Sequence, residues 1–190
     1  MSNLSIMIVG VGGQGTLLAS RILGTVGMKK SYDVKVSEVH GMAQRGGSVV
    51  TYVKFGEKVY SPLIEKGEAD ILLAFERLEA LRWLDYLKKG GKVLVNEQRI
   101  DPMPVIIGKA RYPEGIIEEI KSEYPDTVSI DALKIAGECG NIKTVNMVLI
   151  GLMAKFTHIE KELWLETICE IIPAKLVDVN IKAFEAGYIN

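Results

Sequence analysis

The chain has 190 residues, a hydrophobic fraction of 48% and a net charge of −1 at neutral pH, from 23 basic and 24 acidic side chains. This balance provides no overall positive field that would attract nucleic acid or an anionic membrane surface, so neither is expected as a partner. A chain of this length can bury one sizeable core, and we expect a single domain over residues 1–190.

The sequence carries no signal for export or membrane insertion. Its first residues run directly into an apolar segment and lack the basic and long apolar regions of a secretory signal. The most apolar helical run, residues 145–156, is too short to cross a bilayer and contains Asn146. We therefore expect a cytoplasmic protein.

Cys139 and Cys169 are the two cysteines of the chain, and they belong to no C-x-x-C pair. Their number and spacing disfavour a disulfide framework, a zinc site and an iron–sulfur cluster within this chain. We expect both to be small hydrophobic residues of the core.

The N-terminal third predicts strands and one long helix. Residues 5–9 form a short apolar run typical of a strand buried in a parallel sheet, and residues 14–28 place apolar side chains at helical spacing. Residues 34–39 and 48–55 predict two further strands. Residues 59–60 are expected to pair back on the second of these as a hairpin.

In the middle of the chain, predicted strands and helices continue to alternate. Residues 70–75 predict another buried strand, and residues 76–89 predict a helix that Gly90 and Gly91 end. Residues 92–96 predict the next strand. The charged side chains on this helix are expected to form a solvated face with i,i+3 pairing: Glu76, Arg77, Glu79 and Arg82.

The C-terminal half is mostly helical in its pattern. A short strand or hairpin is expected at residues 105–107, a surface helix at 113–124 and a last strand at 127–130. Alternating strands and helices predict an α/β fold in three layers, with a Rossmann-like, mostly parallel sheet, helices on both faces and a helical C-terminal segment. The helices of that segment are expected at residues 131–138, 144–156, 160–171 and 178–187.

A glycine-rich turn follows the first predicted strand. Its pattern, G-x-G-x-x-G, matches the dinucleotide-binding fingerprint between a strand and a helix, where backbone N–H groups and the helix dipole favour a phosphate. Glu38, near the end of the next strand, is placed to meet a ribose hydroxyl. The alternative is a tight βα turn whose glycines serve only helix–sheet contact, and no Walker A lysine follows. The predicted binding residues of the turn are Gly10, Gly12, Gly13, Gln14, Gly15 and Thr16.

A second glycine-rich loop, residues 39–48, joins two predicted strands. Three glycines in so short a loop are costly in backbone entropy and indicate a positive φ or a close approach by a ligand. They are added to the predicted binding residues: Gly41, Gly46 and Gly47.

The same loop contains the candidate catalytic residues His40, Gln44 and Arg45. The arginine has planar donors suited to a carboxylate or phosphate, and histidine is a residue type suited to acid or base chemistry near neutral pH. A solvated arginine in a tight turn and a hydrogen-bonded structural histidine are equally open interpretations. We expect both glycine-rich segments to follow adjacent strands, so that Gln14 and the three candidates converge on one rim.

These two segments resemble the gamma domain of the 2-oxoacid:ferredoxin oxidoreductases. The resemblance rests on residues 10–15 and, with more specificity, on residues 37–49, which contain the run Val-His-Gly-Met-Ala-Gln-Arg-Gly-Gly. Residues 78–82, 90–93 and 180–187 also resemble segments of this family, so the resemblance covers most of the chain. Within the family, the long run is most similar to the beta subunits of indolepyruvate ferredoxin oxidoreductases.

The resemblance implies a subunit of an enzyme that oxidatively decarboxylates a 2-oxoacid, with indolepyruvate or another arylpyruvate expected, to an acyl-CoA with reduction of ferredoxin. Thiamine diphosphate, magnesium and 4Fe-4S clusters are then expected on a large partner subunit. This chain would hold no cofactor of its own, be inactive alone, form a homodimer when isolated, and help to form the site for CoA and substrate.

Two further functions stay open at this point. One is a stand-alone nucleotide- or CoA-binding Rossmann-like protein that forms homodimers. The second is a small NAD(P)- or FAD-dependent oxidoreductase, which would need a substrate domain and an acid/base residue that are hard to find in 190 residues.

Overall fold

A six-stranded sheet with the order β2-β3-β1-β4-β5-β6 forms the middle layer of this computed structural model, which describes residues 3–41 and 46–190. The pairs β1–β4, β4–β5 and β5–β6 are parallel, and β3 is antiparallel to both of its neighbours. The strands are β1 (Leu4–Val11), β2 (Asp33–His40), β3 (Ser48–Gly56), β4 (Ala69–Ala74), β5 (Leu87–Asn96) and β6 (Val128–Ile130).

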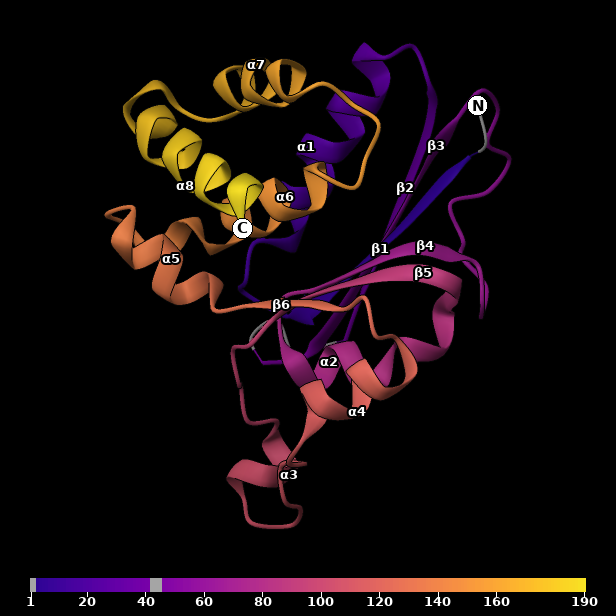
Figure 1. Cartoon of the computed structure of the whole chain (residues 1–190), viewed down its shortest axis with the longest axis vertical. Helices are drawn as coiled ribbons and strands as arrows, with labels where there is room; N and C mark the ends of the chain where they lie inside the picture. The colour runs from indigo at the N-terminus through magenta and orange to yellow at the C-terminus, as the bar shows by residue number, and fades with distance from the viewer. Residues whose placement is uncertain (1–2, 42–45) are drawn as a thin grey trace.

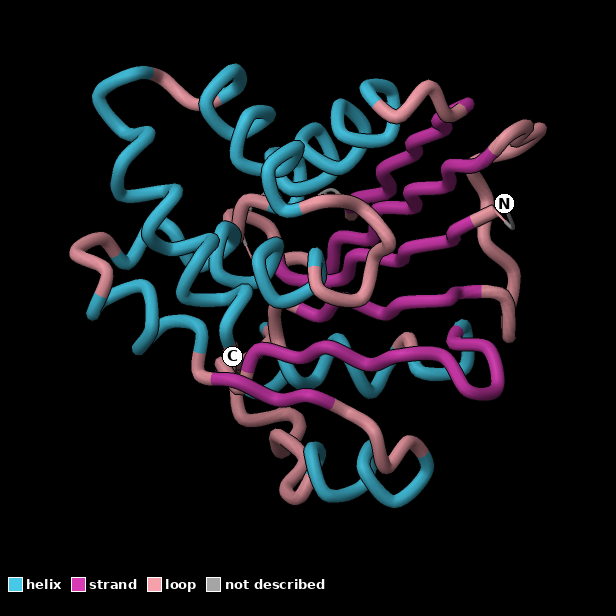
Figure 2. The backbone as a smooth tube through the Cα atoms, turned by 45° about the horizontal axis from the view of Figure 1, so that its top comes forward, coloured by secondary structure: helices cyan, strands magenta, loops and turns pink. Residues whose placement is uncertain are grey.

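Helices cover both faces of this sheet (Figures 1 and 2). One face carries α1 (Thr16–Lys29), α5 (Ala132–Glu138), α6 (Val145–Ala154), α7 (Lys161–Ile171) and α8 (Val177–Ile189). The other face carries α2 (Arg77–Arg82) and α4 (Ile116–Glu123). The expected three-layer, mostly parallel α/β fold with a helical C-terminal segment is therefore confirmed.

Strand β1 contributes to both cores, because successive side chains of a strand point to opposite faces. Ile6 and Ile8 lie in the core under α1 and α6, whereas Met7 and Val9 lie in the core under α2 and α4. All four side chains are fully buried. The apolar run therefore has the two-sided burial expected of a central strand.

The predicted hairpin at residues 59–60 is wrong. Strands β2 and β3 form the hairpin instead, with Asp33 opposite Gly56, and β1 occupies the other edge of β3. Neither edge of β3 is left for residues 59–60. The backbone N–H of Val59 instead donates to the Asp33 carboxylate at 3.0 Å.

The expected helix over residues 76–89 is also too long. Helix α2 ends at Arg82, a 3-10 turn follows over Leu84–Tyr86, and β5 begins at Leu87. The leucines whose spacing suggested one helix lie instead on a helix, a turn and a strand, and these three elements pack on the same core. Gly90, with φ 78°, lies in an irregular stretch of β5 and ends no helix.

Residues 105–107 form no strand or hairpin in the structure. They overlap the short helix α3 (Met103–Ile106), which starts after Pro102 and has Pro104 in its first turn, where proline favours helix initiation. The expected helices at 113–124 and beyond residue 130, and the last strand, are confirmed within a few residues at their ends.

Helices α6 and α8 cross in very close contact. A Cβ on Gly151 would lie 2.0 Å from the carbonyl oxygen of Phe184, and one on Gly187 would lie 1.9 Å from that of Val148. All residues of α6 are buried. Among the described residues, no helix has the length and apolar character needed to span a membrane.

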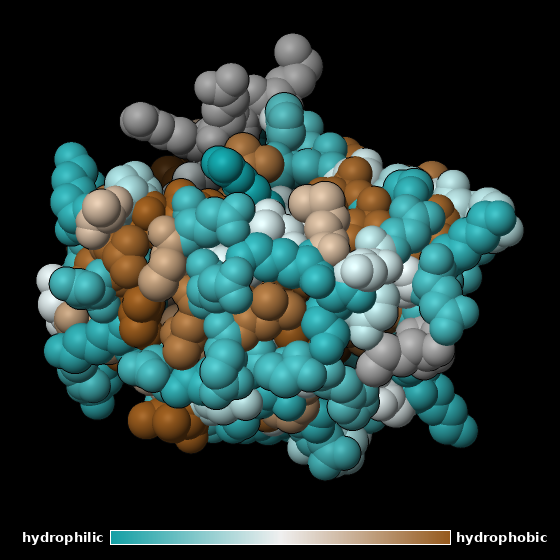
Figure 3. All heavy atoms as spheres, turned by 90° about the horizontal axis from the view of Figure 1, so that it is seen from above, coloured by the Kyte–Doolittle hydropathy of each residue, from teal (hydrophilic) through white to brown (hydrophobic). Residues whose placement is uncertain are grey.

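The two cysteines lie in different environments. Cys139 is buried beside α6 and α8, as expected, but Cys169 is exposed on α7, so its assignment to the core is wrong. The surface seen from above mixes hydrophilic side chains with apolar ones that lie between them (Figure 3).

Candidate functional site

A cavity of about 410 Å³ lies at the carboxyl edge of the sheet, where the first glycine-rich turn faces the end of β2. It brings together residues from both glycine-rich segments that the sequence singled out. Its lining is Gly12, Gly13, Gly15, Thr16, Leu17, Glu38, His40 and Val49.

The N-terminus of α1 opens into this cavity. Its N-cap, Gly15, has φ 85° and provides no side-chain hydrogen bond, so within the described residues no cap side chain occupies the first-turn N–H groups. A Cβ at Gly15 would also lie 2.9 Å from Nδ2 of Asn146 on α6. The glycine is thus required both by its backbone angle and by the closeness of α6, and the uncapped helix end favours an anion.

Glu38 and His40 line the cavity from the end of β2. The Glu38 carboxylate accepts a hydrogen bond from Oγ1 of Thr51 at 3.1 Å, which orients it on the strand face. The His40 side chain is exposed beyond it. The cavity therefore offers a helix N-terminus, an acceptor for a hydroxyl group and an imidazole.

The two glycine-rich segments touch, although their strands are not adjacent. Strand β3 lies between β1 and β2, so the expected adjacency is wrong. The connection from β2 to β3 is short enough for an antiparallel return but too short for a parallel crossover, so β3 pairs with β2, and its other edge pairs with β1. The backbone N–H of Gly12 donates to the carbonyl of Gly47 at 2.9 Å and joins the segments.

Gln14 does not line this cavity, because its amide is bonded within the chain. Its Oε1 accepts from the backbone N–H of Val11 at 2.8 Å, and its Nε2 donates to the carbonyl of Phe75 at 2.9 Å and to Oε1 of Gln98 at 3.1 Å. Gly10 leaves room for this arrangement, since a Cβ there would lie 2.8 Å from the same Oε1. The amide fills the gap between the carboxyl ends of β1 and β4.

Gln44 and Arg45 lie outside the described residues, and their proposed catalytic role stays a prediction. Gly46, described just after them, has φ 80°, a left-handed angle that glycine adopts without strain. Gly41, at the other side of the gap, has open space where a Cβ would be. The binding roles predicted for the glycine-rich residues likewise stay predictions.

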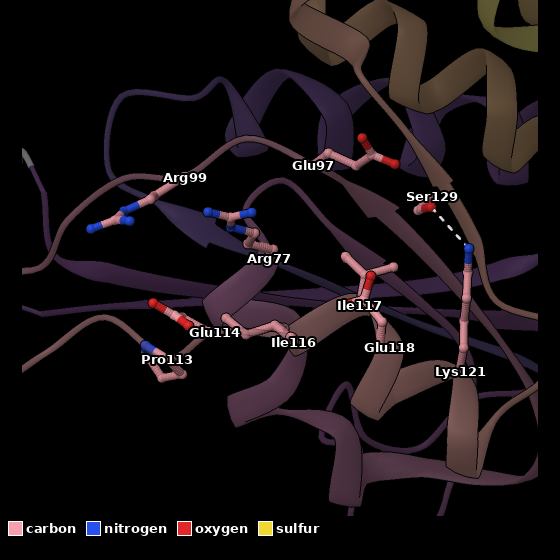
Figure 4. Close-up of a pocket in the computed structure, with 11 residues that line it drawn as sticks. Arg77, Glu97, Arg99, Pro113, Glu114, Ile116, Ile117, Glu118, Lys121 and Ser129 are labelled. Carbon is pink, nitrogen blue, oxygen red and sulfur yellow. Dashed lines mark hydrogen bonds between the residues drawn. The ribbon is translucent and has the colours of Figure 1, made fainter.

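A second cavity of about 450 Å³ lies at the same edge, on the α2 and α4 side (Figure 4). The guanidinium groups of Arg77 and Arg99 lie near one another at one end of it, and Lys121 donates to Ser129 Oγ at 3.4 Å at the other. The remaining lining residues are Glu97, Pro113, Glu114, Gly115, Ile116, Ile117 and Glu118.

The charged face expected on α2 is only partly solvated: Arg82 is exposed and forms the expected i,i+3 pair with Glu79, but Glu76 and Glu79 are only 1% and 2% exposed. Glu79 accepts hydrogen bonds from Ser48 Oγ at 2.5 Å, Arg82 Nη1 at 2.7 Å and Trp83 Nε1 at 3.3 Å. It therefore ties the first residue of β3, directly after the second glycine-rich loop, to α2.

Glu76 connects three segments through one carboxylate. Its Oε2 caps α2 by accepting from the N–H of Glu79 at 2.9 Å. Its Oε1 accepts from the N–H of Ile100 at 3.2 Å and from the Tyr112 hydroxyl at 2.5 Å. Burial, and then this bond to Glu76, raise the pKa of Tyr112 above its ordinary value.

Sequence reasoning missed this second cluster because charged residues at i,i+3 spacing usually lie in solvent. The available signal was position: Glu76 directly follows a buried strand and precedes the helix, where a carboxylate can satisfy free N–H groups. The guanidinium groups of Arg77 and Arg99 lie 5.2 and 4.4 Å from the centroid of the Tyr112 ring, so the ring contacts residues far apart in the sequence.

The chain resembles known proteins along almost its whole length. A family model described as pyruvate ferredoxin/flavodoxin oxidoreductase matches residues 5–189. The indolepyruvate oxidoreductase subunits IorB of Thermococcus kodakarensis and Pyrococcus horikoshii are 44% and 45% identical to it, over 98% of this chain and 95% of theirs.

Solved structures share the fold. A keto/oxoacid ferredoxin oxidoreductase gamma subunit from Geobacter sulfurreducens has a TM-score of 0.72 at 23% identity, over 98% of this chain and 96% of that one. A 2-oxoglutarate:ferredoxin oxidoreductase chain from Magnetococcus marinus has a TM-score of 0.74 at 18% identity, and the match covers all of this chain but 31% of that one. The chain thus belongs to the pyruvate ferredoxin/flavodoxin oxidoreductase family and is a subunit of a 2-oxoacid:ferredoxin oxidoreductase.

Proposed function

We propose that this chain is the small subunit of an oxidoreductase for indolepyruvate or another arylpyruvate. In this reaction the 2-oxoacid loses its carboxylate as CO₂, its acyl group passes to the CoA thiol, and two electrons reduce two ferredoxins with release of one proton. The observation that supports the substrate most is the identity of 44–45% to subunits named for indolepyruvate.

The role proposed for this chain is to form one wall of the CoA and substrate site at the carboxyl edge of the sheet. The uncapped N-terminus of α1 suits a phosphate of CoA, and the Glu38 carboxylate suits a hydroxyl of its ribose. His40 and, from the sequence, Gln44 and Arg45 would face the reacting end. No specific observation favours a stand-alone binding protein or a NAD(P)- or FAD-dependent enzyme over this role.

The donor groups of this chain do not fit the metal cofactors of the reaction. A 4Fe-4S cluster needs four thiolates, whereas the chain has two cysteines, one in the core and one exposed. Among the described residues, no group of three or more His, Cys, Asp or Glu side chains has the geometry for a metal ion. We therefore assign thiamine diphosphate, magnesium and the clusters to a large partner subunit, in a cytoplasmic hetero-oligomer that reduces ferredoxin.

The test is turnover of the complex assembled from this chain and its large subunit. CoA-dependent reduction of ferredoxin should show a higher kcat/KM for indolepyruvate than for pyruvate or 2-oxoglutarate. A preference for a small aliphatic 2-oxoacid would contradict the proposed substrate. Reduction that needs no CoA would contradict the proposed reaction.

The site is tested by His40→Ala in the same complex. The exposed side chain contributes little to stability, so the melting temperature of the free chain should not change, while the KM for CoA should rise several-fold. His158→Ala is the matched control, since the other histidine is exposed on the segment before α7. Equal CoA kinetics for the His40 and His158 variants would remove His40 from the site.

A further inference from the structure

Residues 101–111 form an arm that projects from the sheet and the other helices and carries α3 (Figures 1 and 2). The arm has large apolar side chains in solvent: Met103, Ile106 and Ile107 are 63%, 65% and 54% exposed. Single exposed apolar residues are common on protein surfaces, but a group of three on one turn marks an interaction site.

The backbone of the arm is held by hydrogen bonds within the arm, although it stands away from the body. Its backbone closes on itself, with Ile107 N donating to Met103 O at 3.0 Å, and Lys109 N and Ala110 N donating to Pro104 O at 2.8 and 3.0 Å. A loop that is ordered before binding loses less entropy when a partner covers it.

The base of the arm is fixed to the body from both ends. The Glu76 carboxylate accepts hydrogen bonds from Ile100, just before the arm, and from Tyr112, just after it. Arg99 stacks on the same tyrosine and pairs with Asp101 at 2.6 Å. The buried carboxylate therefore sets the direction in which the apolar tip points.

The arm emerges at the edge that carries the candidate site. It follows the carboxyl end of β5, which is parallel to β4 and β1, so the arm and the first glycine-rich turn leave the sheet at the same edge. A protein that completes the site at this edge also comes within reach of the arm.

We infer that this arm docks into an apolar pocket, rimmed by acidic side chains, on the larger subunit of the oxidoreductase. The inference rests on the proposed function for the identity of that subunit. Lys109 and Arg111 are exposed beside the apolar tip, and Arg99 and Asp101 neutralise each other, so the arm is basic overall. Pairing of two arms from two copies of this chain would bring these cations together, which disfavours a homodimer through the arm.

The experiment compares two triple variants, each expressed with an affinity tag in the source organism. One is Met103→Ser, Ile106→Ser, Ile107→Ser. The matched control is Leu63→Ser, Ile142→Ser, Ile189→Ser, which removes three comparably exposed apolar side chains elsewhere. The readouts are native mass spectrometry and the thiamine diphosphate and iron that copurify with each tagged chain, with the melting temperature as a check of folding.

The arm variant should lose at least nine-tenths of the copurified thiamine diphosphate and iron, while the control retains the wild-type amounts. A charge variant, Lys109→Glu with Arg111→Glu, should slow association at low salt because the rim is acidic. Wild-type association of the arm variant would overturn the inference, as would an arm variant that loses only self-association. Association is measured without turnover. A wild-type complex that forms but is inactive on 2-oxoacids would therefore refute the proposed function, and the association measurements would still test whether the arm docks.

Discussion

Glu76 holds together three segments beside the second cavity. It is buried, and its two oxygens accept hydrogen bonds from two backbone N–H groups and one phenol, so the loss of either oxygen leaves at least one buried donor without an acceptor. The environment of Glu76 depends on partners that are brought together only when the chain folds. The charge pattern of the sequence predicted the opposite environment.

We expect Glu76→Gln to destabilise the chain by about 1–3 kcal/mol, because the amide nitrogen that replaces one oxygen has to face a backbone N–H donor. Urea unfolding measures the change. Glu118→Gln, on the exposed side of α4, is the control and should stay within about 0.5 kcal/mol of wild type. Equal effects of the two substitutions would show that Glu76 contributes no more than a surface residue.

Asp33 predicts a pH dependence. The Lys35 ammonium, and then the backbone N–H of Val59, lower the pKa of the Asp33 carboxyl in the folded chain. A lowered folded pKa means that its contribution to stability is complete above the ordinary carboxyl pKa of about 3.9 and is lost as the pH falls through the folded value.

Asp33→Asn should therefore be less stable than wild type at pH 7, and the difference should shrink as the pH is lowered below about 4. Chemical unfolding over this pH range measures it. Asp126→Asn, at an exposed residue, provides the comparison. A difference that is constant with pH would mean that the Asp33 charge has no part in it.

At the scale of elements, periodicity located nearly every helix and strand but not their pairing. The two-sided apolar runs of β1 and β4 and the helical spacing in α1, α6 and α7 are local properties, and they appear in the structure at the expected places. The position of β3 between β1 and β2 depends on which edges are free, which is not a local property. The same holds for the leucines of residues 78–87, which share a core but belong to different elements.

The close contact between α6 and α8 predicts how substitutions of its glycines change the stability of the chain. Gly151→Ala puts a methyl group into the Phe184 carbonyl and forces the helices apart, so we expect a loss of at least about 3 kcal/mol. Gly137→Ala on α5 is the control, because a Cβ there meets nothing closer than 3.8 Å. It should be neutral or stabilise by up to about 1 kcal/mol, since alanine is the better helix former. Similar melting temperatures for both variants would contradict the tight crossing.

At the scale of the whole molecule, the described residues provide no set of ligands for the metal cofactors of the proposed reaction. The glycine-rich turn could be located from the sequence because Gly13 and Gly15 adopt positive φ angles there, which glycine adopts without strain. The sequence did not locate the Gln14 amide within the protein or the cluster around Tyr112, since both depend on residues brought together from distant parts of the chain.

The isolated chain should consequently contain no stoichiometric iron, thiamine diphosphate or flavin and should not reduce ferredoxin with any 2-oxoacid. Metal analysis, absorption spectra and an activity assay of the purified chain measure this. Addition of the large subunit should restore turnover. A coloured, active preparation of the chain alone would contradict the division of labour between the subunits.

The central place of β1 in the sheet has a consequence for biosynthesis. This strand is made first, yet its two partners are made later: Val9 pairs with Val50 on β3, and Ile8 pairs with Leu73 on β4. At about 5–20 residues per second, the roughly 60 residues between the ends of β1 and β4 take several seconds to synthesise. The strand has no partner on the nascent chain until β3 is made, and its second edge stays unpaired until β4 follows, so it is in this interval that chaperones on the ribosome would protect the protein from aggregation.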